Sequence, residues 1–157
     1  MTRTATQRRI ALSLSLCVFA AQSGLIALSP VLAAVAADFG VSTAVVGQLR
    51  TAAGLAAGLA SLALPAAARR FGLSRLLRGG AVLLAVASLA SAAAPTLAVL
   101  ALCQLPLGIA VSVLMAAATS AAGDWVAVPA RGRVLGWALM GSPAAWIVGM
   151  PALGLGF

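Results

Sequence analysis

Several residue types are missing from this 157-residue chain, and each absence excludes a class of chemistry. The sequence contains no histidine, no lysine and no glutamate, and its only acidic residues are Asp38 and Asp124. A metal site, a Ser-His-Asp triad and a Schiff-base lysine all need side chains from that missing set. We therefore expect no enzyme activity, no cofactor and no metal. Cys17 and Cys103 lie inside apolar runs and are expected to be small buried hydrophobic residues.

Charged residues are also scarce, at 8% of the chain, whereas 63% of the chain is hydrophobic. Soluble domains carry charge on about a quarter of their residues. A surface built from Ala, Leu and Val suits hydrocarbon, which solvates apolar side chains without penalty. The net charge of +8 comes from ten arginines that form no single face with interleaved aromatic residues. The composition therefore predicts a lipid bilayer as the partner, and no nucleic acid.

Long uncharged runs define the expected helices. Ile10 to Ala37 would be a helix of about 42 Å, more than the roughly 30 Å of bilayer hydrocarbon. The uncharged run from Gly79 to Gly123 would reach about 68 Å, so the chain must turn within it, at Ala94-Pro95-Thr96. Thr96, and either Ser42 or Thr43, are expected helix N-caps. The sequence predicts an all-α integral membrane protein with about five spans, near residues 10–36, 43–68, 76–94, 96–123 and 134–157.

The distribution of arginines predicts the topology. Nine of the ten fall in the N-terminal tail and in two expected charged loops, residues 69–78 and 124–133. Basic loops stay on the cytoplasmic side. We therefore expect a multi-pass protein of the cell's inner or plasma membrane with a cytoplasmic N-terminus. Because the chain stops on an apolar segment at Phe157, we expect it to be truncated.

Four stretches in this order resemble the major facilitator superfamily. Pro30, followed by the link from Asp38 to Ser42, is similar to the family's proline-ended first helix and its acidic outer loop; Val46-Gly47-Gln48-Leu49 then opens the second span as in efflux-type members. The segment 65–75 resembles the signature between helices two and three. Its Arg70, Gly72 and Arg75 match; Pro65 replaces the leading glycine and Arg69 the aspartate.

The other two stretches lie on the fourth and fifth spans. Gln104 stands where helix four of the family usually has an arginine, four residues before the matching Gly108. The segment 131–136 resembles the start of helix five, and Gly149, Pro151 and Gly154 resemble the glycine and proline signature that antiporters carry in that helix.

The resemblance implies five helices of a six-helix N-terminal half, in a secondary transporter of twelve or more helices. It further implies efflux of a small-molecule substrate, a drug or a sugar, by proton antiport, with the missing C-terminal half as partner. The alternative is a complete small membrane protein that acts by helix packing or assembly, without transport. None of the predicted spans has an internal carboxylate, so we expect a proton-coupling acid to lie outside this sequence.

Polar residues inside a membrane are costly and are therefore candidate functional residues. The candidates for a substrate pathway are Gln22, Arg50, Gln104 and Ser112. Arg50 is interpreted either as an anion-attracting residue or as an interfacial anchor, and Gly54 and Gly58 on its side of the helix are expected to pack against another helix. Two polar stripes either bond between helices or line a cavity: Ser15, Gln22 and Ser29; Gln104, Ser112 and Thr119.

A second set of candidates concerns conformational change and gating. The hypothesis includes an ion pair between Asp124 and either Arg75 or Arg70, across the two cytoplasmic loops. The glycines and prolines of the fifth span are expected to act as hinges or close-packing positions. The gating set is Arg70, Gly72, Arg75, Asp124, Gly149, Pro151 and Gly154.

Overall fold

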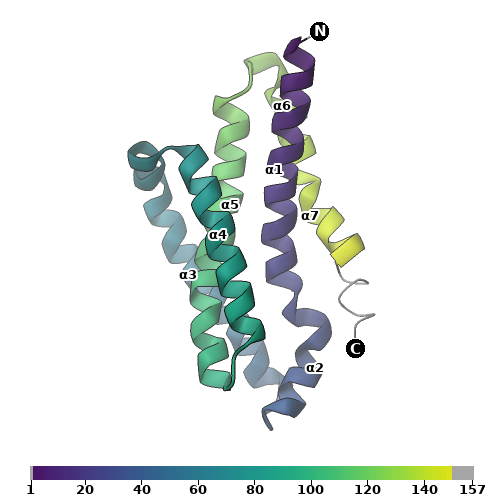
Figure 1. Ribbon diagram of the computed structural model, residues 1–157, viewed down its shortest axis with the longest axis vertical. Helices are drawn as coiled ribbons and strands as arrows, with labels where there is room; N and C mark the ends of the chain where they lie inside the picture. The colour runs from purple at the N-terminus through teal and green to yellow at the C-terminus, as the bar shows by residue number, and fades with distance from the viewer. Residues whose placement is uncertain (1, 150–157) are drawn as a thin grey trace.

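The protein is helical throughout its regular structure in the part of the chain that the structure, a computed structural model, describes: residues 2–149. Long helices run along the longest axis of the molecule (Figure 1). In order, the elements are α1 (Thr2–Ile26), α2 (Leu28–Asp38), α3 (Thr43–Phe71), α4 (Leu73–Ala92), α5 (Leu97–Asp124), α6 (Val128–Leu139), α7 (Gly141–Ala144) and a π-helical turn, η1 (Ala145–Gly149).

Four helical stretches among the described residues are long and apolar enough to cross a membrane. They overlap the first four spans expected from hydropathy. Exposed leucines cover α3 in particular, where Leu59 is 71% and Leu62 80% exposed, as suits a surface that faces lipid or another apolar surface. The four stretches are Thr6–Asp38, Thr43–Phe71, Leu73–Ala92 and Leu97–Asp124.

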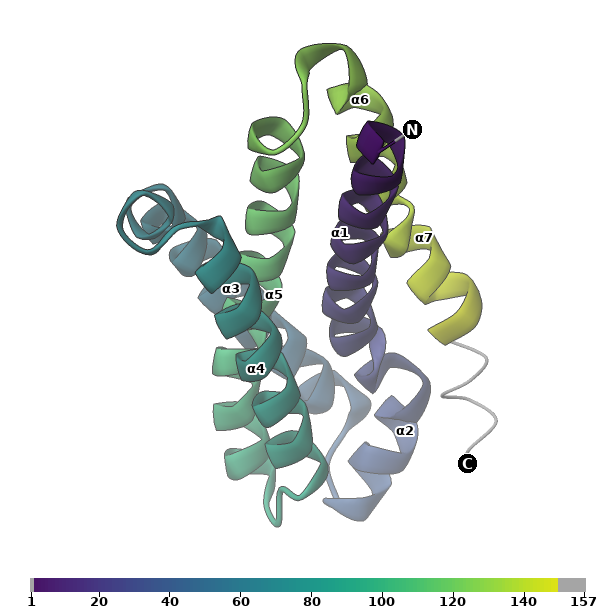
Figure 2. The ribbon, with the colours of Figure 1, turned by 45° about the horizontal axis from the view of Figure 1, so that its top comes forward.

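The first span is not one straight helix. α1 ends at Ile26 and α2 begins at Leu28, with a turn at Ala27. Pro30 has no backbone N–H to donate to the carbonyl of Ile26, so the hydrogen-bond ladder is interrupted at that point. α2 consequently turns away from the axis of α1 (Figure 2).

The prediction of a charged loop at residues 69–78 is wrong. α3 continues to Phe71 and α4 starts at Leu73, so Gly72 alone links them, with φ +79° and ψ 151°. Glycine adopts positive φ without steric cost, which allows this sharp reversal in a single residue. The arginines of this segment therefore sit on the ends of two helices.

The second expected charged loop, residues 124–133, is also shorter than its sequence suggested. α6 begins at Val128, because Pro129 occupies the first turn, where a missing N–H breaks no helical bond. Arg131 is consequently helical, and its Nε donates to the carbonyl of Val126 at 3.0 Å. The fifth stretch then breaks at Met140 and continues through α7 and η1; the expected span 134–157 lies partly outside the described residues.

Two expected caps are confirmed. The Ser42 hydroxyl accepts the N–H of Val45 at 3.4 Å, at the start of α3. The Thr96 hydroxyl accepts the N–H of Val99 at 3.3 Å, at the start of α5. Each satisfies one of the backbone donors that a helix leaves unpaired at its N-terminus.

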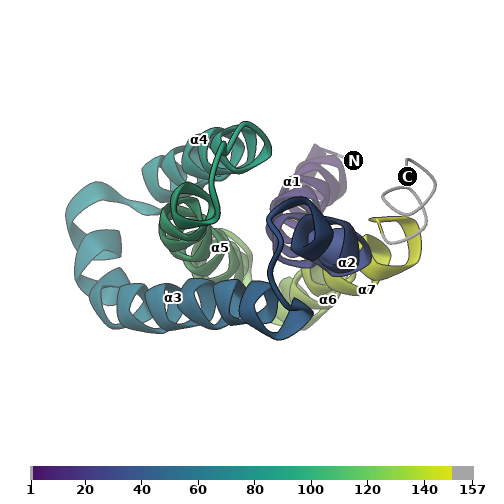
Figure 3. The same ribbon diagram turned by 90° about the horizontal axis from the view of Figure 1, so that it is seen from below.

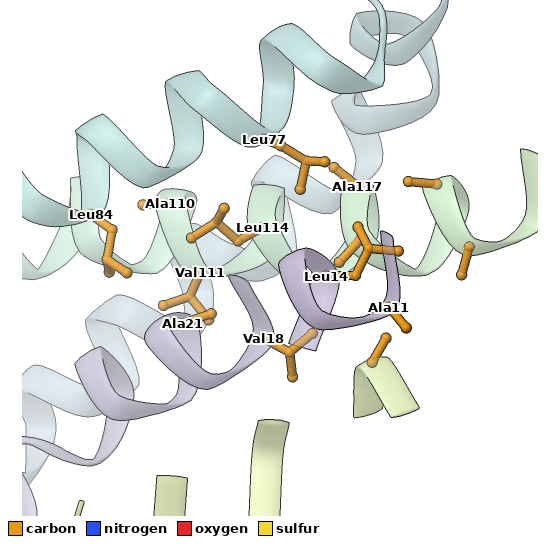
Figure 4. Packing of buried hydrophobic residues seen from close by; sticks show 14 of the residues in the cluster. Ala11, Leu14, Val18, Ala21, Leu77, Leu84, Ala110, Val111, Leu114 and Ala117 are labelled. Atoms are coloured by element: carbon orange, nitrogen blue, oxygen red, sulfur yellow. The ribbon is translucent and has the colours of Figure 1, made fainter. Parts of the chain in front are cut away.

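α5 is the central helix, because eleven of its 28 residues are buried. It lies against α1, α3 and α4 (Figure 3). Five of its buried residues are alanines, and Figure 4 shows Leu14 of α1 and Leu77 of α4 in the core beside this helix. Small residues allow helix backbones to approach closely. In a membrane the hydrophobic effect does not hold helices together, so close van der Waals packing of this kind is a main source of their association.

The closest approach is between α3 and α5. A Cβ added at Gly108 would lie 2.8 Å from the carbonyl carbon of Ala53 and collide with its oxygen. Gly141 of α7 is packed in the same way on α1, against the backbone of Ser15 and Phe19. These glycines are required by packing.

The links between helices lie alternately toward the two ends of the bundle. The N-terminus, the α3–α4 link and the α5–α6 link lie toward one end, and the α2–α3 and α4–α5 links lie toward the other (Figure 1). All described arginines except Arg50 belong to the first end, the arginine-rich end, or to the helix termini that meet there. Which compartment this end faces stays a prediction.

Candidate functional site

Gln104 is the one polar residue that is buried as a whole in the described part of the chain, with 6% exposure. The Ser23 hydroxyl is buried too, but on a half-buried residue. The Nε2 of Gln104 donates to the hydroxyl of Ser91 at 3.4 Å, and that hydroxyl donates to the carbonyl of Ala87 at 2.8 Å. The chain of bonds ties α5 to α4. A buried amide needs several partners, since an unmet hydrogen-bonding group costs about 1–3 kcal/mol.

A cavity of about 490 Å³ lies beside this amide. It opens between α1 and α2 on one side and α4 and α5 on the other, toward the end opposite the arginines. Most of its wall is apolar, and Asp38 and Phe39 stand at the end of α2. Its polar lining consists of Asp38, Ser88, Ser91 and Gln104.

Gln22 bonds across the bundle to a residue that the sequence did not single out. Its Nε2 donates to the Ser142 hydroxyl at 2.6 Å and so joins α1 to α7. The packing of Gly141 on the α1 backbone brings this serine within reach. Ser142 lies between Gly141 and Pro143 in the short helix α7, and only its place against α1 distinguishes it.

Arg50 is half-buried and turned toward the protein. Its Nη1 donates to the hydroxyl of Ser29 at 2.5 Å, which links α3 to the short helix α2. The expected close-packing role of Gly54 and Gly58 is wrong within the described chain: both are exposed, and a Cβ at either would meet nothing within 4 Å. Arg50 leans toward α2, whereas the two glycines turn outward.

The polar residues predicted to form a stripe on α5 do not all bond to another helix. Thr119 donates to the carbonyls of Met115 and Ala116 in its own helix, both at 3.0 Å, so its hydroxyl is satisfied locally. Ser112 is half-buried. Of the expected stripe, Gln104 alone bonds to another helix.

Three of the candidate gating residues lie together at the arginine-rich end. Arg75 and Asp124 line one cavity of about 450 Å³, together with Gly72. The hypothesised ion pair is absent: among the described side chains no carboxylate lies within 4.0 Å of a guanidinium. Arg70 instead lies over the Phe71 ring, 5.5 Å from its centroid.

Part of the gating set cannot be placed with the others. Gly149 ends η1, and Pro151 and Gly154 lie outside the described residues. The described residues contain no group of three His, Cys, Asp or Glu side chains able to hold a metal. Cys17 and Cys103 are both free and half-buried.

Four membrane-length helices around a small-residue core, with one buried amide beside a cavity, define a multi-pass α-helical membrane protein. Residues 14–157 match the family model described as Major Facilitator Superfamily, which covers most of the chain. The chain belongs to the Major Facilitator Superfamily, a family of membrane transporters, not of enzymes. Comparisons with curated proteins and with solved structures gave no match.

Proposed function

We propose that this chain supplies the N-terminal helices of a proton-driven efflux transporter whose substrate is a small amphiphilic molecule. Family membership gives secondary transport, and the proposal adds direction, coupling and substrate class. The rest of the transporter, a C-terminal half, is its partner. The observation that carries the proposal is the cavity beside Gln104, which combines apolar walls with a few convergent polar groups.

The lining of this cavity favours a drug-like molecule over a sugar. A sugar has hydroxyls around its whole ring, and each needs a partner when it leaves water. The cavity offers one amide, two serine hydroxyls and the carboxylate of Asp38, against a wall made chiefly of Ala, Leu and Val. A ligand with an apolar body and one or two polar groups matches that distribution.

The remaining pathway candidates have unequal support. Gln22, held by Ser142, lies at the contact of α1 with α7, where a movement of α7 would break its bond. The bond from Arg50 to Ser29 favours a structural role for Arg50, which joins α3 to α2, over an anion-attracting one. Ser112 remains a candidate, half-buried and without a described side-chain hydrogen bond.

Proton coupling needs a titratable group in the membrane interior. Among the described helices, the only carboxylates are Asp38 at the end of α2 and Asp124 at the end of α5. In this proposal the coupling acid therefore belongs to helices of the transporter other than the four described spans.

The test replaces Gln104 by leucine in the transporter that contains this chain and measures energised efflux of a lipophilic fluorescent dye. Loss of one neutral hydrogen bond to the substrate costs about 1 kcal/mol, so we expect a roughly fivefold higher KM. Gln48→Leu is the matched control, because Gln48 is exposed at the start of α3 and does not line the cavity. A protonophore should abolish efflux in all variants.

The outcomes separate the proposal from its alternative. Equal KM values for the parent and Gln104→Leu, at equal amounts of folded protein, would remove the cavity from the substrate path. Efflux that persists without a proton gradient would refute antiport. If the chain alone assembles into a stable oligomer and no substrate moves, the alternative of a protein that acts by helix packing is supported instead.

A further inference from the structure

The cavity at the arginine-rich end also has the features of a binding site for an anion. Arg75 and Arg78, one turn apart at the start of α4, both line it, and Trp125 and Phe71 stand at its rim with 43% and 50% exposure. Asp124 is the one acid among its lining residues. Two guanidinium groups against one carboxylate leave the cavity with a positive balance.

Both guanidinium groups have free donors. Arg78 uses its Nε for the carbonyl of Ser74, at 3.2 Å, which leaves its terminal amino groups available. Arg75 is exposed, and within residues 2–149 its guanidinium has no described partner. A guanidinium presents a planar fork of donors that fits the oxygens of a phosphate group.

A mostly apolar cavity of about 230 Å³ lies next to the first, on the side of the membrane-spanning part of the bundle. The two cavities share Ala68 and Leu73. The second is walled by α3, α4 and α5, through residues such as Leu64, Leu76 and Ala117. The walls therefore change from cationic to aliphatic as they go from the end of the bundle toward its middle.

We propose that these two neighbouring cavities together bind one anionic glycerophospholipid of the leaflet at the arginine-rich end. Its phosphate and headgroup bind Arg75 and Arg78, one acyl chain lies in the groove between α3, α4 and α5, and Trp125 lies at the level of the ester groups. Basic pockets between helices recognise anionic headgroups, and aromatic rings prefer this interfacial depth. The mostly apolar second cavity is what selects a lipid over free phosphate.

The test uses the fluorescence of Trp125 in the full chain, reconstituted in vesicles. Trp137 and Trp146 are 54% and 45% exposed and are replaced by phenylalanine, so that Trp125 is the only tryptophan. Lipids with bromine on an acyl chain quench tryptophan on contact. Brominated phosphatidylglycerol and brominated phosphatidylcholine are compared at equal mole fraction. We expect phosphatidylglycerol to be preferred by at least about fivefold, since each arginine near the surface contributes about that factor.

Two double variants locate the effect. Arg75→Gln with Arg78→Gln should bring the ratio of the two lipids close to one. Arg8→Gln with Arg9→Gln removes the same charge from exposed positions of α1 that do not line the cavity, and should keep most of the preference. Circular dichroism confirms that each variant is folded.

Three results would overturn the proposal. Equal quenching by the two lipids in the parent would mean that the cavity does not select charge. An equal loss in the α1 variant would mean general attraction to an anionic surface. Relief of quenching by millimolar inorganic phosphate, at constant ionic strength, would mean that the cavity binds phosphate and not a lipid.

Discussion

Gly108→Ala tests the crossing of α3 and α5 that organises the bundle. The new Cβ would stand 2.8 Å from the carbonyl carbon of Ala53, whereas ordinary contacts begin at 3.4 Å. The obstacle is backbone, and the carbonyl oxygen of Ala53 is nearer still than its carbon. No side chain can rotate away, so the two helices must separate by more than an ångström. Overpacking of this kind costs about 1–3 kcal/mol. Because the clash is with backbone, we expect the upper part of this range, about 2–3 kcal/mol. The gain in helix propensity from glycine to alanine, about 1 kcal/mol, offsets part of it and leaves a net cost of about 1–2 kcal/mol.

The measurement is reversible unfolding of the purified chain in mixed micelles, followed by circular dichroism. We expect Gly108→Ala to lower the free energy of unfolding by about 1–2 kcal/mol, which is a factor of about 5 to 30 in the folded population. Gly54→Ala is the matched control in the partner helix. Its added Cβ meets nothing within 4 Å, so it should be neutral or stabilising by up to about 1 kcal/mol.

Two outcomes would refute this reasoning. If Gly108→Ala is as stable as the parent, the crossing is looser than described. If Gly54→Ala is destabilised as much as Gly108→Ala, then Gly54 is a packing position as its spacing first suggested, and the outward orientation of that face is wrong.

Two further predictions concern α2 and the topology. In a double-mutant cycle, Arg50→Ala and Ser29→Ala should couple by about 1–2 kcal/mol, because their bond joins α3 to α2 and involves a charged donor; strictly additive effects on unfolding would show that the bond is absent. In a background without the native cysteines, cysteines placed at Ser74 and Pro95 should react with an impermeant maleimide from opposite sides of sealed vesicles. Modification of both from one side would contradict the alternating links.

Hydropathy and charge were sufficient to predict most of the fold. A membrane requires long apolar helices, and it forces the chain to turn wherever an uncharged run exceeds its thickness. The turn at Pro95 and the caps at Ser42 and Thr96 follow from local chemistry, and all three are present in the structure. These features depend on a few neighbouring residues and on the solvent.

The errors arose where a local signal is ambiguous. Arginines at 69–78 indicated a loop, but a helix end at the membrane surface accepts arginine equally well, since the long side chain reaches the aqueous side. The single-residue link then depends on the positive φ of Gly72, which the sequence permits but does not require. The sequence likewise permits the turn at Ala27 without requiring it, because a proline such as Pro30 can either kink a helix or break it.

The residue types that make the site could be predicted from the sequence, but their hydrogen-bond partners could not. Gln104 and Gln22 were candidates because amides are costly in hydrocarbon, and the structure gives each a hydroxyl partner on another helix. Neither Ser91 nor Ser142 was foreseen, since serine is frequent in these helices and its significance depends on the helix opposite. Small-residue spacing likewise failed for Gly54 and Gly58, because it shows that a face is smooth without showing what lies against it.

At the buried alanines of α5, we expect smaller replacements to change stability little and larger ones to change it strongly. Ala110, Ala117 and Ala118 contribute a single methyl group each, so truncation there removes almost no contact surface. Any larger residue, however conservative chemically, must displace the neighbours that already fill the space around it. Hydrophobicity scales therefore rank changes in this helix poorly, and side-chain volume is the property that decides which sequences can occupy it.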